Sequence, residues 1–103
     1  MPPIRAQLLA ICGPVKGTAW PLGDRDLRIG RGRQLEICLT DAAASRNHAV
    51  IVREDGRFQL EDLGSTNGTH VNGKPVRQAA LIPGDQIQIG HTVFEFQVQG
   101  DSI

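Results

Sequence analysis

Residues 94–99 read Phe-Glu-Phe-Gln-Val-Gln, an alternation of apolar and polar side chains. A period of two places the apolar side chains on one face of a β-strand and the polar ones on the other. Residues 86–89 (Gln-Ile-Gln-Ile) and 58–61 (Phe-Gln-Leu-Glu) show the same alternation, whereas residues 49–52 (Ala-Val-Ile-Val) are continuously apolar. A continuous run is typical of a strand that is covered on both faces or lies near the centre of a sandwich. No window of ten or more residues keeps a helical period, so the pattern predicts an all-β fold.

Turn signals separate these runs. The pairs Asp55-Gly56, Asn67-Gly68 and Asn72-Gly73 suit tight hairpin turns, which need positive φ. The runs between the turns are candidate strands at about 5–12, 18–22, 26–30, 36–39, 48–53, 57–62, 69–72, 75–77, 79–81, 86–90 and 93–99. Many short strands at close spacing indicate an all-β sandwich or barrel with hairpin-like connections.

The length of 103 residues and the share of apolar residues, 40%, fit one ordinary globular domain. The N-terminus lacks a basic segment followed by a hydrophobic run, and no stretch approaches the roughly 20 apolar residues of a membrane span. We therefore expect a cytoplasmic location and no membrane partner. Cys12 and Cys38 both occur in apolar, strand-like runs. We therefore expect two free, buried thiols rather than a disulfide.

The balance of charge argues against a polyanion as the ligand. Eleven basic and eleven acidic residues give a net charge of zero, whereas proteins that bind duplex nucleic acid usually carry a basic excess. Five arginines nevertheless fall within a short stretch, at Arg25, Arg28, Arg31, Arg33 and Arg46. This local bias suits a small anionic group, and we expect no direct binding of nucleic acid.

Three polar clusters lie next to predicted strands and supply the groups that bind phosphate. Arg31 follows a glycine at a strand end, where its guanidinium can make charge-assisted hydrogen bonds to phosphate oxygens. Ser45 and Thr66 can donate hydroxyl hydrogens from neighbouring loops, and the Asn67 amide, both donor and acceptor, suits a peptide main chain. These residue types predict a receptor for a phosphorylated group.

The order of the motifs resembles that of the forkhead-associated (FHA) domain, a module that binds phosphothreonine peptides. The matching segments are Ile29-Gly30-Arg31, Ser45-Arg46-Asn47-His48, Asp62-Leu63-Gly64-Ser65-Thr66-Asn67-Gly68-Thr69, Asn72-Gly73, Leu81-Ile82-Pro83-Gly84-Asp85 and Ile89-Gly90. They cover the chain from about residue 22 to residue 98. One departure is His70, where the family more often has an aromatic residue.

The resemblance implies a SMAD/FHA-like β-sandwich of about eleven short, mainly antiparallel strands. It assigns Arg31, Ser45 and Thr66 to the phosphate, Arg46 to an assisting role and Asn67 to the peptide main chain. Structural support of the binding loops would come from Gly30, His48, Gly64, Gly68 and Asn72. His48 would hold the loops by hydrogen bonds without touching the ligand.

The resemblance also implies a partner and a context. The partner would be a protein that contains phosphothreonine, recruited in signalling or regulation without a cofactor. Residues 1–103 would form a single FHA domain, and we expect it to be an N-terminal module covalently linked to further domains of a longer regulatory protein.

The sequence also bears on four other roles: catalysis, metal binding, a scaffold that does not need phosphate, and nucleic-acid binding. No nucleophile elbow surrounds Ser45, so we do not expect Ser45 and His48 to act as the nucleophile and base of an enzyme, and we expect no enzyme. The three histidines lack the spacing of metal ligands, so we expect no metal. A scaffold domain that uses the same sandwich without phosphate is the main alternative. Nucleic-acid binding through the arginines is a second alternative, and it predicts steep salt dependence.

Overall fold

The computed structural model describes residues 5–99, and these contain eleven strands. The strands are β1 (Arg5–Cys12), β2 (Ala19–Leu22), β3 (Leu27–Gly30), β4 (Ile37–Cys38), β5 (Ala49–Glu54), β6 (Arg57–Asp62), β7 (Thr69–Val71), β8 (Lys74–Val76), β9 (Gln78–Ala80), β10 (Gln86–Ile89) and β11 (Thr92–Gln99). Each of them begins and ends within one residue of a predicted strand. Within the described range no helix is long and apolar enough to cross a membrane.

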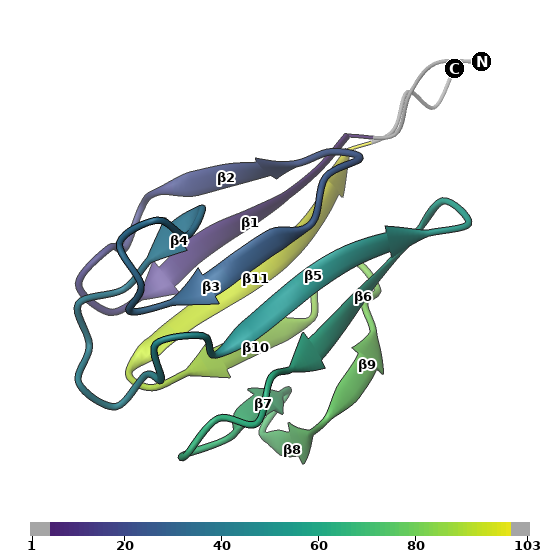
Figure 1. Cartoon of the computed structure of the whole chain (residues 1–103). Coiled ribbons are helices and arrows are strands. Elements are labelled where there is room, and N and C mark those ends of the chain that lie inside the picture. Colours follow the sequence, from purple (N-terminus) through teal and green to yellow (C-terminus); the bar gives the residue numbers. More distant parts are fainter. Residues whose placement is uncertain (1–4, 100–103) are drawn as a thin grey trace.

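The strands form two sheets that pack face to face (Figure 1). One sheet has the order β2-β1-β11-β10-β7-β8 and the other the order β4-β3-β5-β6-β9. The neighbouring strands pair antiparallel, except that β3 and β4 pair parallel. The predicted β-sandwich of mainly antiparallel strands is therefore confirmed.

The core lies between the two sheets and follows the period-two pattern. Phe94 and Phe96 of β11 are almost fully buried, while the polar residues that alternate with them lie on the outer face. Phe96 meets Phe58 of the opposite sheet edge to face, with ring centroids 5.7 Å apart, a preferred geometry for aromatic pairs. The continuously apolar run at residues 49–52 lies in β5, the middle strand of its sheet, as its pattern predicts.

Two of the three predicted hairpin turns are present. Asp55-Gly56 and Asn72-Gly73 have positive φ at both residues and join β5 to β6 and β7 to β8, as two-residue hairpin loops require. The same expectation for Asn67-Gly68 is wrong. That pair lies between β6 and β7, which belong to different sheets, so it connects the two layers instead of closing a hairpin.

The two cysteines are free, as predicted, but both are exposed, so the prediction that they are buried is wrong. Cys38 alternates with the buried Ile37 and Leu39 and therefore points away from the core. Cys12 follows an irregularity in the pairing of β1 with β11 between Ala10 and Cys12, and this shift breaks the alternation that would have turned it inward. The error at Cys38 arises from treating an apolar run as uniformly buried, and the error at Cys12 arises from the irregular pairing.

Candidate functional site

The three polar clusters come together at one end of the sandwich. The end of β3, the loop between β4 and β5, and the loop between β6 and β7 lie side by side there (Figure 1). Arg31 follows β3, Ser45 and Arg46 belong to the second segment, and Thr66 and Asn67 belong to the third. All five predicted ligand-binding residues are therefore on neighbouring loops.

Gly30 allows the first two segments to approach each other. The backbone amide of Arg31 donates to the Ser45 carbonyl at 3.0 Å, and the amide of Gly32 donates to the Arg46 carbonyl at 3.1 Å. A Cβ atom at residue 30 would collide with the Arg46 carbonyl. Only glycine allows this close approach without moving a loop.

The Arg31 side chain is held by the backbone of the neighbouring loop. Its Nε donates to the Ala44 carbonyl at 2.5 Å. Among residues 5–99 this is the only hydrogen bond of its guanidinium, so the terminal nitrogens remain available to an anion. A guanidinium that is fixed through Nε loses less conformational entropy when it binds a ligand.

Ser45, Thr66 and Asn67 link the second loop to the third. The Ser45 Oγ accepts a hydrogen bond from the Thr66 amide at 3.0 Å. The Asn67 amide nitrogen donates to the Ala43 carbonyl at 2.9 Å. The Ser45 hydroxyl hydrogen and the Asn67 carbonyl oxygen can still serve a ligand after these bonds form.

His48 is fully buried and joins the loop between β4 and β5 to the loop between β6 and β7. Its Nδ1 accepts from the Ser45 amide at 3.0 Å, so Nε2 carries the hydrogen and donates to the Gly68 carbonyl at 2.9 Å. Because backbone groups occupy both ring nitrogens and the Ser45 Oγ faces Thr66, Ser45 and His48 do not form a nucleophile–base pair.

Asp62 organises the loop between β6 and β7, a role that the sequence reasoning did not assign to it. Its carboxylate accepts from the amides of Gly64 and Ser65 at 2.8 Å each, from the Ser65 hydroxyl at 2.5 Å and from the Thr69 hydroxyl at 2.7 Å. Burial raises the pKa of Asp62, but the hydrogen bonds from Ser65, Thr69 and Gly64 together outweigh it and lower the pKa below its usual value. An aspartate followed by Gly and Ser two and three residues later is typical of an Asx turn, and that signal could have identified it.

The glycines of this loop have the predicted backbone role, whereas Asn72 lies elsewhere. Gly64 and Gly68 have φ of +79° and +86°, which favour glycine. Asn72 donates to the Asp85 carboxylate at 2.9 Å and accepts from the Gln86 amide at 3.0 Å. In contrast to the expectation, its contacts therefore brace the β7–β8 turn and not the binding loops.

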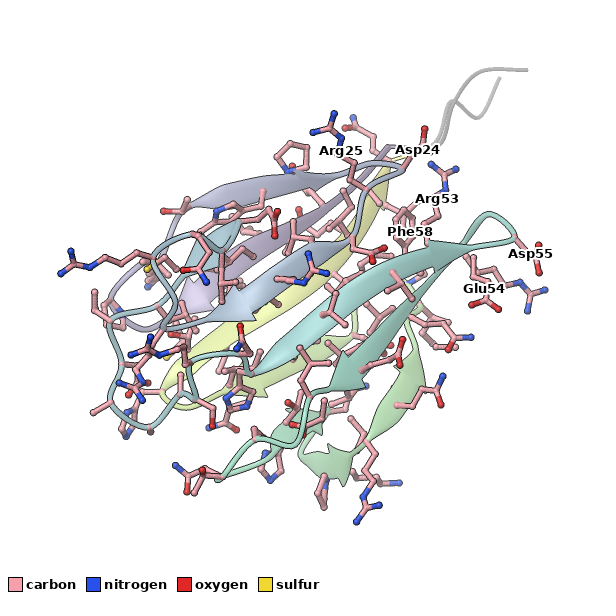
Figure 2. All side chains as sticks on the ribbon, in the orientation of Figure 1. Asp24, Arg25, Arg53, Glu54, Asp55 and Phe58 are labelled. Atoms are coloured by element: carbon pink, nitrogen blue, oxygen red, sulfur yellow. The ribbon has the colours of Figure 1, made fainter. Side chains whose placement is uncertain are left out.

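The arginines do not form one patch. Figure 2 shows Arg25 with Asp24 and Arg53 at the other end of the sandwich, away from the loops of the site. Arg53 pairs there with Asp24 at 3.1 Å and lies over the Phe58 ring, beside a surface hollow of about 730 Å³ that Gln7, Asp24 and Arg53 help to line. None of the predicted site residues lines this hollow. Across residues 5–99, no group of three or more candidate side chains is arranged to hold a metal ion.

Comparison with known proteins identifies the family. The model of the FHA domain family matches residues 27–90, which is more than half of the chain. The chain belongs to the FHA domain family. The matched FHA region contains β3 to β10, together with every loop of the candidate site.

Relatives of this FHA domain include named regulatory proteins. The glycogen accumulation regulator GarA of Mycolicibacterium smegmatis is 41% identical over 90 residues, which cover 87% of this chain and 57% of GarA. The oxoglutarate dehydrogenase inhibitor of Corynebacterium diphtheriae is 40% identical over 90 residues, which cover 86% of this chain and 63% of the inhibitor. The chain thus spans only about six-tenths of the length of these relatives.

Solved FHA domains have the same architecture. One, from a study of phosphothreonine-dependent FHA domain interactions, has a TM-score of 0.85 at 32% identity and covers 94% of this chain and 99% of its own. Mycobacterium tuberculosis EmbR, solved with a low-affinity phosphopeptide, also has a TM-score of 0.85, at 36% identity. That match covers 96% of this chain and 26% of EmbR.

Proposed function

We propose that this FHA domain binds phosphothreonine in a partner protein through Arg31, Ser45, Thr66 and Asn67, with Arg46 assisting. The observation that carries the proposal is the network of hydrogen bonds among these loops, in which Arg31 and Asn67 are held by adjacent carbonyls and Ser45 is bonded to the Thr66 amide. Such a network orients the donors before the ligand arrives. The phosphopeptide complex of EmbR supports the assignment of the ligand class.

The chemistry of the ligand matches these donors. A phosphothreonine carries about −1.5 to −2 charges at neutral pH and three acceptor oxygens. Three or four hydrogen bonds to the charged group, at about 1.5–3 kcal/mol each, less the cost of ordering a peptide, correspond to micromolar affinity. We therefore expect a reversible regulatory interaction.

The wider context belongs to the same proposal. The chain acts as a binding module and not as an enzyme, and relatives described as a regulator and an inhibitor support this reading. Its relatives are longer, which supports a place within a longer regulatory protein. A cytoplasmic location fits the two exposed free thiols, because disulfides are rare in reducing compartments.

The test is a titration with peptides labelled for fluorescence anisotropy. Pools that contain phosphothreonine, phosphoserine or unmodified threonine are titrated with the wild type, with Arg31→Ala and with Arg25→Ala. Arg25 is the matched control because it is also an exposed arginine but lies at the opposite end of the sandwich (Figure 2). Saturable binding of the phosphothreonine pool, lost in Arg31→Ala and kept in Arg25→Ala, supports the proposal.

Other outcomes identify the alternatives. Capture of a partner that survives phosphatase treatment and the Arg31→Ala change indicates a scaffold that does not need phosphate. Binding of nucleic acid that falls steeply with salt and is weakened equally by either arginine variant indicates a polyanion surface.

A further inference from the structure

Asp41 joins two segments that are fifty residues apart in the chain. Its Oδ2 accepts from the backbone amide of His91 at 2.5 Å, and its Oδ1 accepts from the Ala43 amide at 2.9 Å. The His91 ring lies 3.2 Å from both oxygens. Because His91 forms the turn between β10 and β11, the carboxylate connects that turn of one sheet to the β4–β5 loop of the other.

The segment that Asp41 holds also orients two residues of the proposed binding site. The Ala43 carbonyl accepts from the Asn67 side chain, and the Ala44 carbonyl accepts from Arg31 Nε. A displacement of residues 41–44 would therefore move both carbonyls and the side chains that they hold. Asp41 itself is directed toward the turn and its own loop, and its side chain is only 8% exposed.

Gly90 leaves the space that this carboxylate occupies. Its φ is +60°, and a Cβ atom there would collide with the Asp41 carboxyl group. The glycine that ends the Ile89-Gly90 motif is thus required by the contact as well as by the turn.

We propose that Asp41 is a positioning residue for the phosphopeptide site, because it fixes residues 41–44, whose carbonyls orient Arg31 and Asn67. This inference rests on the proposed function. A carboxylate at this end of the domain would otherwise disfavour an anionic ligand, so its presence calls for a structural reason of this kind. The hydrogen bond from the His91 amide has the largest effect on the pKa of Asp41 and that from the Ala43 amide the next largest, and both lower it. The carboxylate therefore stays ionised at neutral pH.

The experiment compares Asp41→Ala with Asp24→Ala. Both aspartates accept hydrogen bonds, but Asp24 pairs with Arg53 at the far end of the sandwich (Figure 2). The first readout is the exchange of the Arg31 Nε–H with water, followed by NMR in the protein without peptide and assigned with Arg31→Lys. The second readout is the affinity for the phosphothreonine peptide pool.

We expect Asp41→Ala to speed the Arg31 Nε–H exchange and to weaken peptide binding by about tenfold or more, the equivalent of one strong hydrogen bond. Asp24→Ala should leave both readouts unchanged. Asp41→Asn, which keeps one acceptor oxygen, should lie between the wild type and Asp41→Ala. If Asp41→Ala does not fold, Asp41→Asn perturbs the same contact less severely.

Two results overturn the inference: unchanged Arg31 Nε–H exchange in the folded Asp41 variants, or an equal effect of Asp24→Ala. If Asp41→Ala speeds the Arg31 Nε–H exchange but the wild type binds no phosphopeptide, the positioning of Arg31 is supported and the proposed function is refuted. The two failures are therefore distinguishable.

Discussion

Replacing His48 by Phe should lower the free energy of unfolding by about 2–6 kcal/mol, because two polar groups lose their partners when an apolar ring replaces the imidazole. The groups are the Ser45 amide and the Gly68 carbonyl, which bond to Nδ1 and Nε2 at 3.0 and 2.9 Å. An unsatisfied buried donor or acceptor costs about 1–3 kcal/mol, and both of these groups are partly buried. The sum of the two losses gives the expected range.

The same change should weaken phosphopeptide binding by about tenfold or more, because it removes the buried link between the loop of Ser45 and the loop of Thr66. Unfolding is measured in urea by the fluorescence of Trp20, the single tryptophan, which packs edge to face against Phe94 with ring centroids 5.7 Å apart. Binding is measured with the phosphothreonine peptides. Trp20 lies on β2, outside the binding loops, so the probe reports on the sandwich as a whole.

His70→Phe is the matched control. It makes the same chemical change two residues after Gly68, where the family more often has an aromatic residue, and should leave stability and affinity close to those of the wild type. A loss of less than about 0.5 kcal/mol in His48→Phe, the size of an ordinary surface substitution, would refute the reasoning. So would an unchanged affinity in a destabilised protein, because it would show that the loops do not depend on the ring.

Four further changes test other parts of the structure. Gly30→Ala should lower the free energy of unfolding in urea by about 1–3 kcal/mol, because the new Cβ overpacks against the Arg46 carbonyl. An unchanged free energy of unfolding would mean that the loop moves freely. Asp62 has a lowered pKa in the folded state, so its stabilisation is present at neutral pH and is lost as the pH falls from about 4 through the folded value. An acid titration of stability should therefore decline less steeply in Asp62→Asn than in the wild type, and parallel curves would contradict this account. Thr92 is fully buried and, among residues 5–99, its hydroxyl has no hydrogen-bond partner. Thr92→Val should therefore raise the melting temperature, by roughly 4–8 °C for each kcal/mol gained. A melting temperature below that of the wild type would show that the hydroxyl is satisfied. Finally, affinity for phosphothreonine should weaken between about pH 7 and 5 as the phosphate loses its second charge, and a constant affinity would mean that the dianion is not preferred.

Much of the fold could be predicted from local patterns. Apolar runs and the turn signals between them located all eleven strands to within one residue, and Asp55-Gly56 and Asn72-Gly73 identified two hairpins by their need for positive φ. The pattern failed for Cys12 and for Asn67-Gly68. A bulge and a crossing between sheets depend on partners that are distant in the chain, and no local window contains them.

The candidate site also has features that the sequence predicts and features that it does not. Residue identity alone shows which chemical groups are present, because guanidinium, hydroxyl and amide side chains belong to known residue types. How these groups are held depends on tertiary contacts: the bond from Arg31 to the Ala44 carbonyl, the ring of His48 between two loops, and the link from Asp41 to His91. These contacts join residues 13, 20 and 50 positions apart. The Arg31 contact forms because β3 lies between β4 and β5 in one sheet, and the Asp41–His91 link forms because the two packed sheets bring their loops to one end of the sandwich.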